Sequence, residues 1–112
     1  MRNMEEARGK VSLSGFELDE AEKAIVDNII KSWQHKISER TEYDYIKIDL
    51  KKTKKGNNFL HEVKGTLKKR NELFTSQATD FNLFAATAEV LEKLLNNILT
   101  GFIILGFWNS QL

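Results

Sequence analysis

The stretch TDFNLFAATAEVLEKLLNNIL, residues 79–99, decides the fold. Apolar side chains recur in it at steps of three and four residues, which predicts one amphipathic helix with a wide apolar stripe. Asp80 is the expected cap, because its carboxylate can accept hydrogen bonds from the free N–H groups of the first turn. A stripe this wide needs a large apolar partner, which the rest of the chain must supply. The stripe comprises Phe84, Ala88, Leu91, Leu95 and Ile98, widened by Phe81, Val90 and Leu94.

Four strands and a second helix are predicted upstream of that stretch. Residues 10–16 alternate apolar and polar side chains and indicate a strand that ends near Gly15. A helix then begins at Asp19, which forms a capping box with Glu22. Alternation returns in residues 43–51, 59–69 and 72–78, with turns at 54–58 and 70–71. On the first two of these strands one face is apolar and the other is charged; on the last, the pattern leaves open which face is buried.

This order predicts an α+β fold of the type β-α-β-β-β-α. Three successive strands form an antiparallel meander, and a right-handed crossover through the first helix lets the first strand lie parallel to a neighbour. Both helices pack on one face of a four-stranded sheet, which gives two layers. The other face stays open and carries Lys47, Lys51, Lys64 and Lys68. The predicted organisation is a flexible tail of residues 1–9, one domain of residues 10–99, and an apolar C-terminal tail of residues 100–112.

Composition excludes several classes of function. The chain has 112 residues and no cysteine, so disulfides, thiolate metal sites and cysteine nucleophiles are impossible. A cysteine-free chain fits a reducing, cytoplasmic setting. Charged residues near Met1 argue against a secretory signal, and the longest apolar run, 102–108, is far shorter than a membrane span of about 20 residues.

Positive charge is concentrated in the middle of the sequence. Residues 1–46 hold seven Lys/Arg and ten Asp/Glu, residues 47–70 hold nine and two, and residues 71–112 hold one and four. The net charge of +1 hides this asymmetry. Two interpretations are about equally supported: an anion-binding patch, or a hairpin kept soluble and unpaired by its lysines.

No arrangement of residues points to catalysis or to a metal. His35 and His61 have no ligand partners at metal-binding spacing, and the carboxylates at Asp19, Glu20 and Glu22 are explained by helix capping. The sequence also lacks a glycine-rich phosphate loop and a nucleophile elbow. We therefore expect neither an enzyme nor a bound cofactor or metal.

The basic cluster is the one chemical signal. Its lysines fall on two adjacent strands and at their ends, which predicts a stripe suited to a phosphate backbone. Tyr45 and Phe74 are the aromatic candidates for base stacking beside it. The predicted nucleic-acid-binding residues on the sheet are Lys47, Lys51, Lys52, Lys54, Lys55, Lys64, Lys68, Lys69 and Arg70.

The order of elements and the start of the second helix resemble the family of ribosome hibernation-promoting factors and ribosome-associated translation inhibitors. The resemblance rests on Asp80, on the run Leu83-Phe84-Ala85-Ala86, and on Lys93-Leu94. The start of the first helix, residues 16–21, and the step Ile30-Lys31 are also similar. The likeness covers residues 10–99 as a diffuse pattern without an invariant signature.

The resemblance implies a small cytoplasmic RNA-binding protein that associates with the small ribosomal subunit and inhibits or stores ribosomes. Carried over by position, it implies RNA contacts at Lys31, at Lys51 or Lys52, and at Lys93. The chain departs from the family pattern on the second helix, which is net acidic through Glu89 and Glu92. That departure shifts the expected contact with ribosomal RNA from the helix to the hairpin lysines.

The C-terminal tail supports an alternative function. Residues 101–112 carry no charged side chain, so three explanations are open: the tail packs back on the domain, forms a subunit interface, or is not native to a working full-length protein. In the second case the chain is a non-enzymatic interaction module that self-associates, for instance as a homodimer. The predicted interface comprises Phe102, Ile103, Leu105, Phe107 and Trp108.

Overall fold

The computed structural model describes the backbone of residues 10–111 and the side chains of residues 10–100. The predicted tail of residues 1–9 lies outside the described residues. The order β-α-β-β-β-α and the α+β class are as predicted. In chain order the elements are β1 (Lys10–Ser14), α2 (Glu20–Arg40), β2 (Tyr45–Lys55), β3 (Asn58–Lys69), β4 (Glu72–Asp80) and α3 (Leu83–Gln111).

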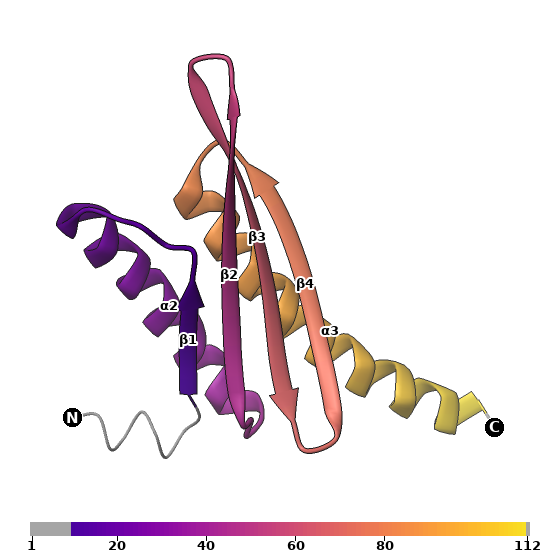
Figure 1. Cartoon of the computed structure of the whole chain (residues 1–112). Helices are drawn as coiled ribbons and strands as arrows, with labels where there is room; N and C mark the ends of the chain where they lie inside the picture. Colours follow the sequence, from indigo (N-terminus) through magenta and orange to yellow (C-terminus); the bar gives the residue numbers. More distant parts are fainter. Residues whose placement is uncertain (1–9, 112) are drawn as a thin grey trace.

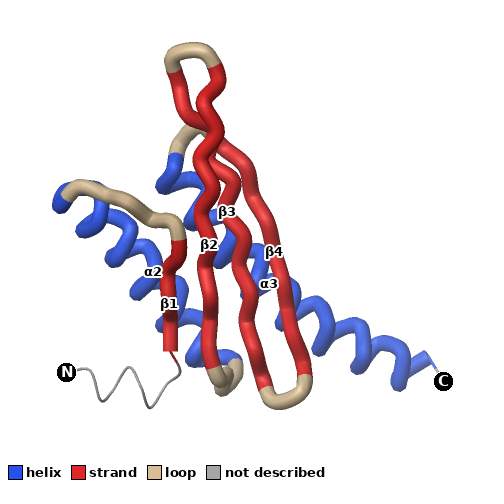
Figure 2. Tube along the Cα trace, in the orientation of Figure 1, coloured by secondary structure: helices blue, strands red, loops and turns tan. Residues whose placement is uncertain are grey.

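The four strands form one mixed sheet in the order β1-β2-β3-β4. β1 runs parallel to β2, whereas β2, β3 and β4 form the expected antiparallel meander. Both helices lie on the same face of the sheet, so its other face is uncovered (Figures 1 and 2). Within the described part of the chain, no helix is long and apolar enough to cross a membrane.

The start of α2 is capped as predicted. An oxygen of the Asp19 carboxylate accepts a hydrogen bond from the Glu22 backbone N–H at 2.7 Å, and the Glu22 carboxylate accepts one from the Asp19 N–H at 3.2 Å. This reciprocal capping box satisfies two backbone N–H groups that an exposed helix start would leave to water.

The start of α3 differs from the prediction. β4 continues to Asp80, because Thr79 and Asp80 still pair with Glu62 and His61 of β3. The cap is Asn82, whose side-chain oxygen accepts hydrogen bonds from two backbone N–H groups of the first turn at 2.9 and 3.1 Å. Asp80 stabilises the turn before the helix, where its carboxylate accepts a hydrogen bond from the Asn82 N–H at 2.8 Å. α3 also continues beyond residue 99, where the predicted helix ends, to Gln111.

The core lies between the helices and the sheet. Ile46 and Ile48 of β2 and Val63 and Leu67 of β3 are fully buried against the helices, on the faces that the alternation predicted. On β4 the helix-facing side, undecided from sequence, contains Phe74, Ser76 and Ala78, as the register with β3 requires. Phe81 is exposed and precedes α3, so it is not part of the stripe. The buried residues of α3 are Leu83, Ala86, Thr87, Val90, Leu91, Leu94 and Ile98.

Gly65 sets how closely α3 approaches the sheet. A Cβ atom at Gly65 would lie 2.5 Å from Cγ1 of Val90 and 3.0 Å from Cδ1 of Leu94. Beside it, the Ser76 hydroxyl donates a hydrogen bond to the backbone carbonyl of Val90 at 2.8 Å. Glycine is therefore required at this position by packing.

We predict that Gly65→Ala lowers the free energy of unfolding by about 1 to 3 kcal/mol, the usual effect of overpacking a core. Chemical denaturation measures this change. Val90→Ala removes the atom that would clash, so the double variant should lose less stability than the sum of the two single variants. Strict additivity would show that Val90 does not limit the space at Gly65.

Candidate nucleic-acid interface

Lysines form a line between β2 and β3 on the open face of the sheet. Side chains opposite each other in the ladder share a face, so the register places Lys68 beside Tyr45, Lys47 beside Thr66, and so on along the pair. Each pair on this face contains one lysine except Thr53–Leu60. The five open-face pairs with a lysine are Tyr45–Lys68, Lys47–Thr66, Asp49–Lys64, Lys51–Glu62 and Lys55–Asn58.

This line is regular and carries more positive than negative charge. Successive pairs on one face are two residues apart, or about 6.8 Å along a strand. Two carboxylates, Asp49 and Glu62, share this face. The described residues contain ion pairs at Lys23–Asp27, His35–Glu39 and Lys93–Glu89, and none of these involves a sheet lysine. The ammonium groups of the line are therefore available to an external anion.

The β2–β3 hairpin projects beyond the rest of the sheet. Its ladder continues to Lys55 and Asn58, whereas β1 ends opposite Asp49 and β4 ends opposite His61. Figures 1 and 2 show this hairpin as a finger that extends past the other strands. It is closed by Gly56 and Asn57, and Gly56 has a φ of 63°, which glycine adopts without strain. Lys52 and Lys54 on one face and Lys51 and Lys55 on the other are all exposed.

Phe59 lies on this finger, although the alternation of residues 59–69 predicts that its side chain shares the apolar, core-facing side of the strand. Phe59 is on the helix-facing side of β3, but the helices do not cover the finger, so its side chain remains 47% exposed. The Lys52 ammonium lies 5.3 Å from the centre of the Phe59 ring. Comparing strand lengths, since β2 and β3 exceed their neighbours, would have revealed this exposure. Tyr45, a predicted stacking candidate, is 40% exposed beside Lys68, whereas Phe74 faces the helices and packs against the core.

The two helical lysines implied by the family resemblance lie apart from this surface. Lys31 is exposed on α2, in the layer on the opposite side of the sheet from the open face. Lys93 on α3 donates a hydrogen bond to the backbone carbonyl of Gln77 at 2.9 Å and pairs with the Glu89 carboxylate at 2.9 Å. Both contacts give Lys93 a structural role, while its contact with RNA stays a prediction.

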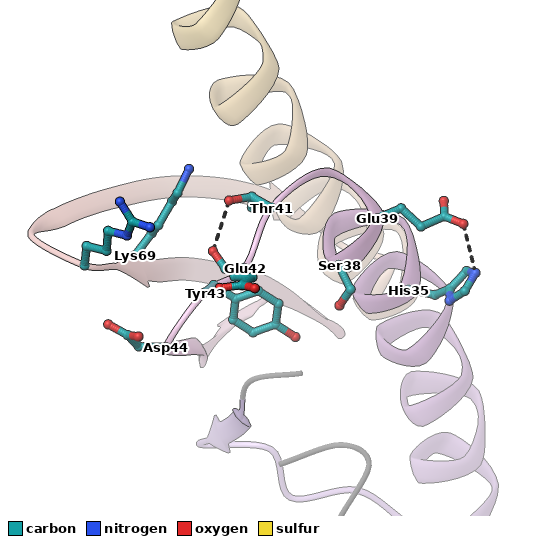
Figure 3. Close-up of a pocket in the computed structure, with 9 residues that line it drawn as sticks. His35, Ser38, Glu39, Thr41, Glu42, Tyr43, Asp44 and Lys69 are labelled. Carbon is teal, nitrogen blue, oxygen red and sulfur yellow. Dashed lines mark hydrogen bonds and ion pairs between the residues drawn. The ribbon is translucent and has the colours of Figure 1, made fainter. Parts of the chain in front are cut away.

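Lys69 and Arg70 lie at the other end of the sheet, beside a cleft of about 860 Å³ (Figure 3). The end of α2, the connection to β2 and the β3–β4 turn form this cleft. The walls mix charges, because Glu39, Glu42 and Asp44 line the cleft together with the two basic residues. His35 lies 3.3 Å from Glu39, and the buried Ser38 hydroxyl makes no hydrogen bond. The cleft is therefore not a continuation of the basic line.

The described residues contain no group of three His, Cys, Asp or Glu that could hold a metal ion. Within the cleft, His35 is paired with Glu39 and makes no hydrogen bond to Ser38. His35 and Ser38 therefore do not form a nucleophile–base pair.

Comparisons with known proteins find similar folds but low sequence similarity. No family model matches the sequence, and no curated protein matches it. Among solved structures, a ribosomal subunit interface protein from Coxiella burnetii is similar, with a TM-score of 0.64 and 14% identity, over 84% of this chain and 98% of that chain. The chain has the fold of a ribosomal subunit interface protein. The N-terminal domain of Thermus thermophilus Protein Y is also similar, with a TM-score of 0.51 and 14% identity over 80% and 91% of the two chains. The resemblance expected from the sequence is thus confirmed at the level of the fold.

Arg70 adopts a backbone conformation that is unfavourable for its residue type. Its φ of 55° lies in the left-handed region, where a Cβ atom costs roughly 1–2 kcal/mol. We predict that Arg70→Gly raises the free energy of unfolding by about 1 kcal/mol in thermal or chemical denaturation. Asn71→Gly, at the neighbouring position where φ is not positive, should give no such gain. Equal effects of the two substitutions would contradict the explanation.

Proposed function

We propose that this chain is a small cytoplasmic RNA-binding protein that associates with the small ribosomal subunit and inhibits or stores ribosomes. The observation that carries the proposal is the line of unpaired lysines on the open face, continued by the lysine finger, on a fold shared with a ribosomal subunit interface protein. The fold likeness supports ribosome association in general. The lysine surface supports ribosomal RNA as the component that is contacted.

The geometry of the lysine line favours a phosphate backbone over a small anion. A small anion needs several donors converging on one point, whereas these lysines are spread along about 20 Å between Lys68 and Lys51. A polyanion can meet such a row with successive phosphates, and its affinity then comes from the release of condensed counterions. The arrangement favours shape- and charge-dependent binding with little reading of base sequence.

The finger adds reach and a stacking surface. Its exposed lysines on both faces allow it to enter a groove between phosphate backbones, where each face meets negative charge. Phe59 adds an aromatic face next to the Lys52 ammonium, and such a pair suits an unstacked base. In this proposal the finger inserts into RNA and the open face holds the adjacent backbone.

Self-association through the C-terminal segment is the second candidate function. Figure 1 supports it, because α3 continues well past the sheet to Gln111, and the sequence after Thr100 carries no charge. The predicted interface of Phe102, Ile103, Leu105, Phe107 and Trp108 lies beyond the described side chains. This function requires concentration-dependent oligomers that disappear in Phe107→Lys, with no affinity for ribosomes.

The test of ribosome binding is co-sedimentation of the purified chain with small subunits at about 50 and 200 mM salt. We expect binding at low salt that weakens steeply at high salt. Lys51→Gln/Lys54→Gln/Lys55→Gln, which removes three finger charges, should weaken binding and make the log–log salt dependence shallower by about 2 to 3 units. The matched control is Lys23→Gln/Lys36→Gln/Arg40→Gln on α2, with the same loss of charge.

Equal weakening by the two triple variants would mean that net charge, not the finger, governs binding. No co-sedimentation of the unmodified chain at low salt would overturn the proposal. Addition of the chain to a cell-free translation reaction then tests inhibition, which the finger variant should lose in proportion to its loss of binding.

We predict that Phe59→Ala weakens binding to single-stranded RNA by roughly 5- to 150-fold, since stacking on one aromatic ring is worth about 1–3 kcal/mol per base. The salt dependence should stay unchanged, because no charge is removed. Fluorescence anisotropy with a labelled oligonucleotide measures both quantities. Phe81→Ala, which removes an exposed phenylalanine just before α3, is the control and should bind normally. Normal binding by Phe59→Ala would leave the finger with electrostatic contacts alone.

A further inference from the structure

The two edge strands of the sheet, β4 and β1, differ in whether side chains bind their outward backbone groups. Along β4, side chains of α3 occupy alternate backbone carbonyls: Lys93 donates to Gln77 and Asn97 donates to Thr75, each at 2.9 Å. These contacts hinder the pairing of another strand with β4, because they use the groups that a ladder would need. The other edge strand, β1, has no such contact among the described side chains.

β1 presents a complete set of backbone groups to its free edge. The Lys10 N–H donates to the Asp44 carbonyl at 3.5 Å, so the backbone of Lys10 points toward β2. Successive residues of a strand point their N–H and C=O groups to opposite sides, which directs those of Val11 and Leu13 away from the sheet. β1 contains neither proline nor a bulge to discourage pairing. Among the residues that the structure describes, nothing pairs with this edge, so it can accept one more strand.

The surroundings of this edge define what the added strand must look like. On the helix side of the sheet, Leu13 is 38% exposed and Ile25 in the second turn of α2 is 44% exposed. Figures 1 and 2 show the first turns of α2 lying outside β1, beyond the edge of the sheet. An added strand would thus have one face toward apolar side chains and the other toward solvent. It must alternate apolar and polar residues over about five positions.

We propose that β1 of a second copy of this chain occupies this edge. The sequence of β1, Lys10-Val11-Ser12-Leu13-Ser14, has the required alternation. In an antiparallel pair with the two-fold axis at Ser12, Val11 of each copy lies opposite Leu13 of the other, and Lys10 lies opposite Ser14. The outward groups of Val11 and Leu13 then form four hydrogen bonds, and no two like charges are opposed. Because the patch is complementary to itself, the contact closes as a symmetric dimer.

Other occupants fit this edge less well. Residues 1–9 of the same chain carry four charges, at Arg2, Glu5, Glu6 and Arg8, and lack the apolar alternation. The β2–β3 finger has free edges too, but four lysines within residues 51–55 would repel their counterparts in a second copy. A five-residue strand buries little area, so the dimer is weak, with a dissociation constant in roughly the micromolar range or above.

The register of the proposed pair is tested by cross-linking, for which the natural absence of cysteine gives a clean background. In Ser12→Cys the two sulfurs face each other in a non-hydrogen-bonded pair, with Cα atoms about 4.5 Å apart, a separation that a disulfide accepts. Mild oxidation should produce a covalent dimer. Thr75→Cys on β4, where the edge is occupied, should give no covalent dimer. No covalent dimer in either variant, or equal cross-linking in both, would overturn the proposal.

A second measurement needs no new bond. Sedimentation velocity across a concentration series should show reversible dimers of the unmodified chain. Leu13→Asp places a carboxylate among apolar side chains at the interface and should weaken the dimer about tenfold or more. Leu73→Asp, a matched change at an exposed leucine of β4, should leave it within about twofold. Circular dichroism confirms that both variants are folded.

Alternative interfaces give distinct results in the same experiment. A dimer that persists in Leu13→Asp but is lost in Phe107→Lys would overturn the proposal and assign the contact to the C-terminal segment. A dimer that resists Phe107→Lys and is lost in Leu13→Asp supports it. A chain that is monomeric at every concentration up to about 1 mM would overturn it as well.

Discussion

The close contact between α3 and β3 at Gly65 is the constraint on which the rest of the structure depends. Because Gly65 has no side chain, Val90 and Leu94 can approach the sheet, and the hydroxyl of Ser76 can reach the carbonyl of Val90. This contact fixes α3 over β3 and β4. It also brings Lys93 and Asn97 to the backbone of β4, where they occupy the edge. The absence of a side chain at Gly65 therefore contributes to the occupation of the β4 edge by side chains of α3.

The candidate binding surface arises from a mismatch in strand length. β2 and β3 have 11 and 12 residues, whereas β1 has 5 and β4 has 9. The helices cover the part of the sheet that all four strands share, and the excess length of β2 and β3 becomes the finger. Within the covered part, alternation buries Ile46 and Ile48. Beyond it, the same alternation exposes Phe59 and Lys52 on one face and Lys51 and Lys55 on the other.

Local patterns were sufficient to predict the element order, the fold class and the buried faces of β2 and β3. The capping box at Asp19 was also predictable, because its partners are three residues apart in sequence. The cap of α3 was not, because Asp80 and Asn82 are both good caps and the choice depends on how far β4 stays paired with β3. The exposure of Phe59 was not predictable for the same reason. Alternation tells which way a side chain points, but not whether a helix covers it.

The candidate site shows the same division between local and long-range information. The lysine density of residues 47–70 was visible in the sequence, whereas the separation of Lys69 and Arg70 into a mixed-charge cleft was not. That separation depends on Glu39, Glu42 and Asp44, which are distant in sequence and meet the β3–β4 turn only in the folded chain. The role of Lys93 depends likewise on a β4 carbonyl that lies 16 residues earlier in the chain.

Charge is distributed unequally between the two layers, so the two faces of the molecule differ in their attraction for anions. The two helices together carry six carboxylates and five basic side chains, so their layer is close to neutral. The four strands carry nine lysines and four carboxylates, and most of these lysines lie on the open face or on the finger. The sheet face therefore attracts a polyanion more strongly than the helix face does, although the net charge of the chain is only +1. The helices build the core, and the proposed function does not require them to bind RNA, so α3 can be acidic in a chain whose opposite face is basic.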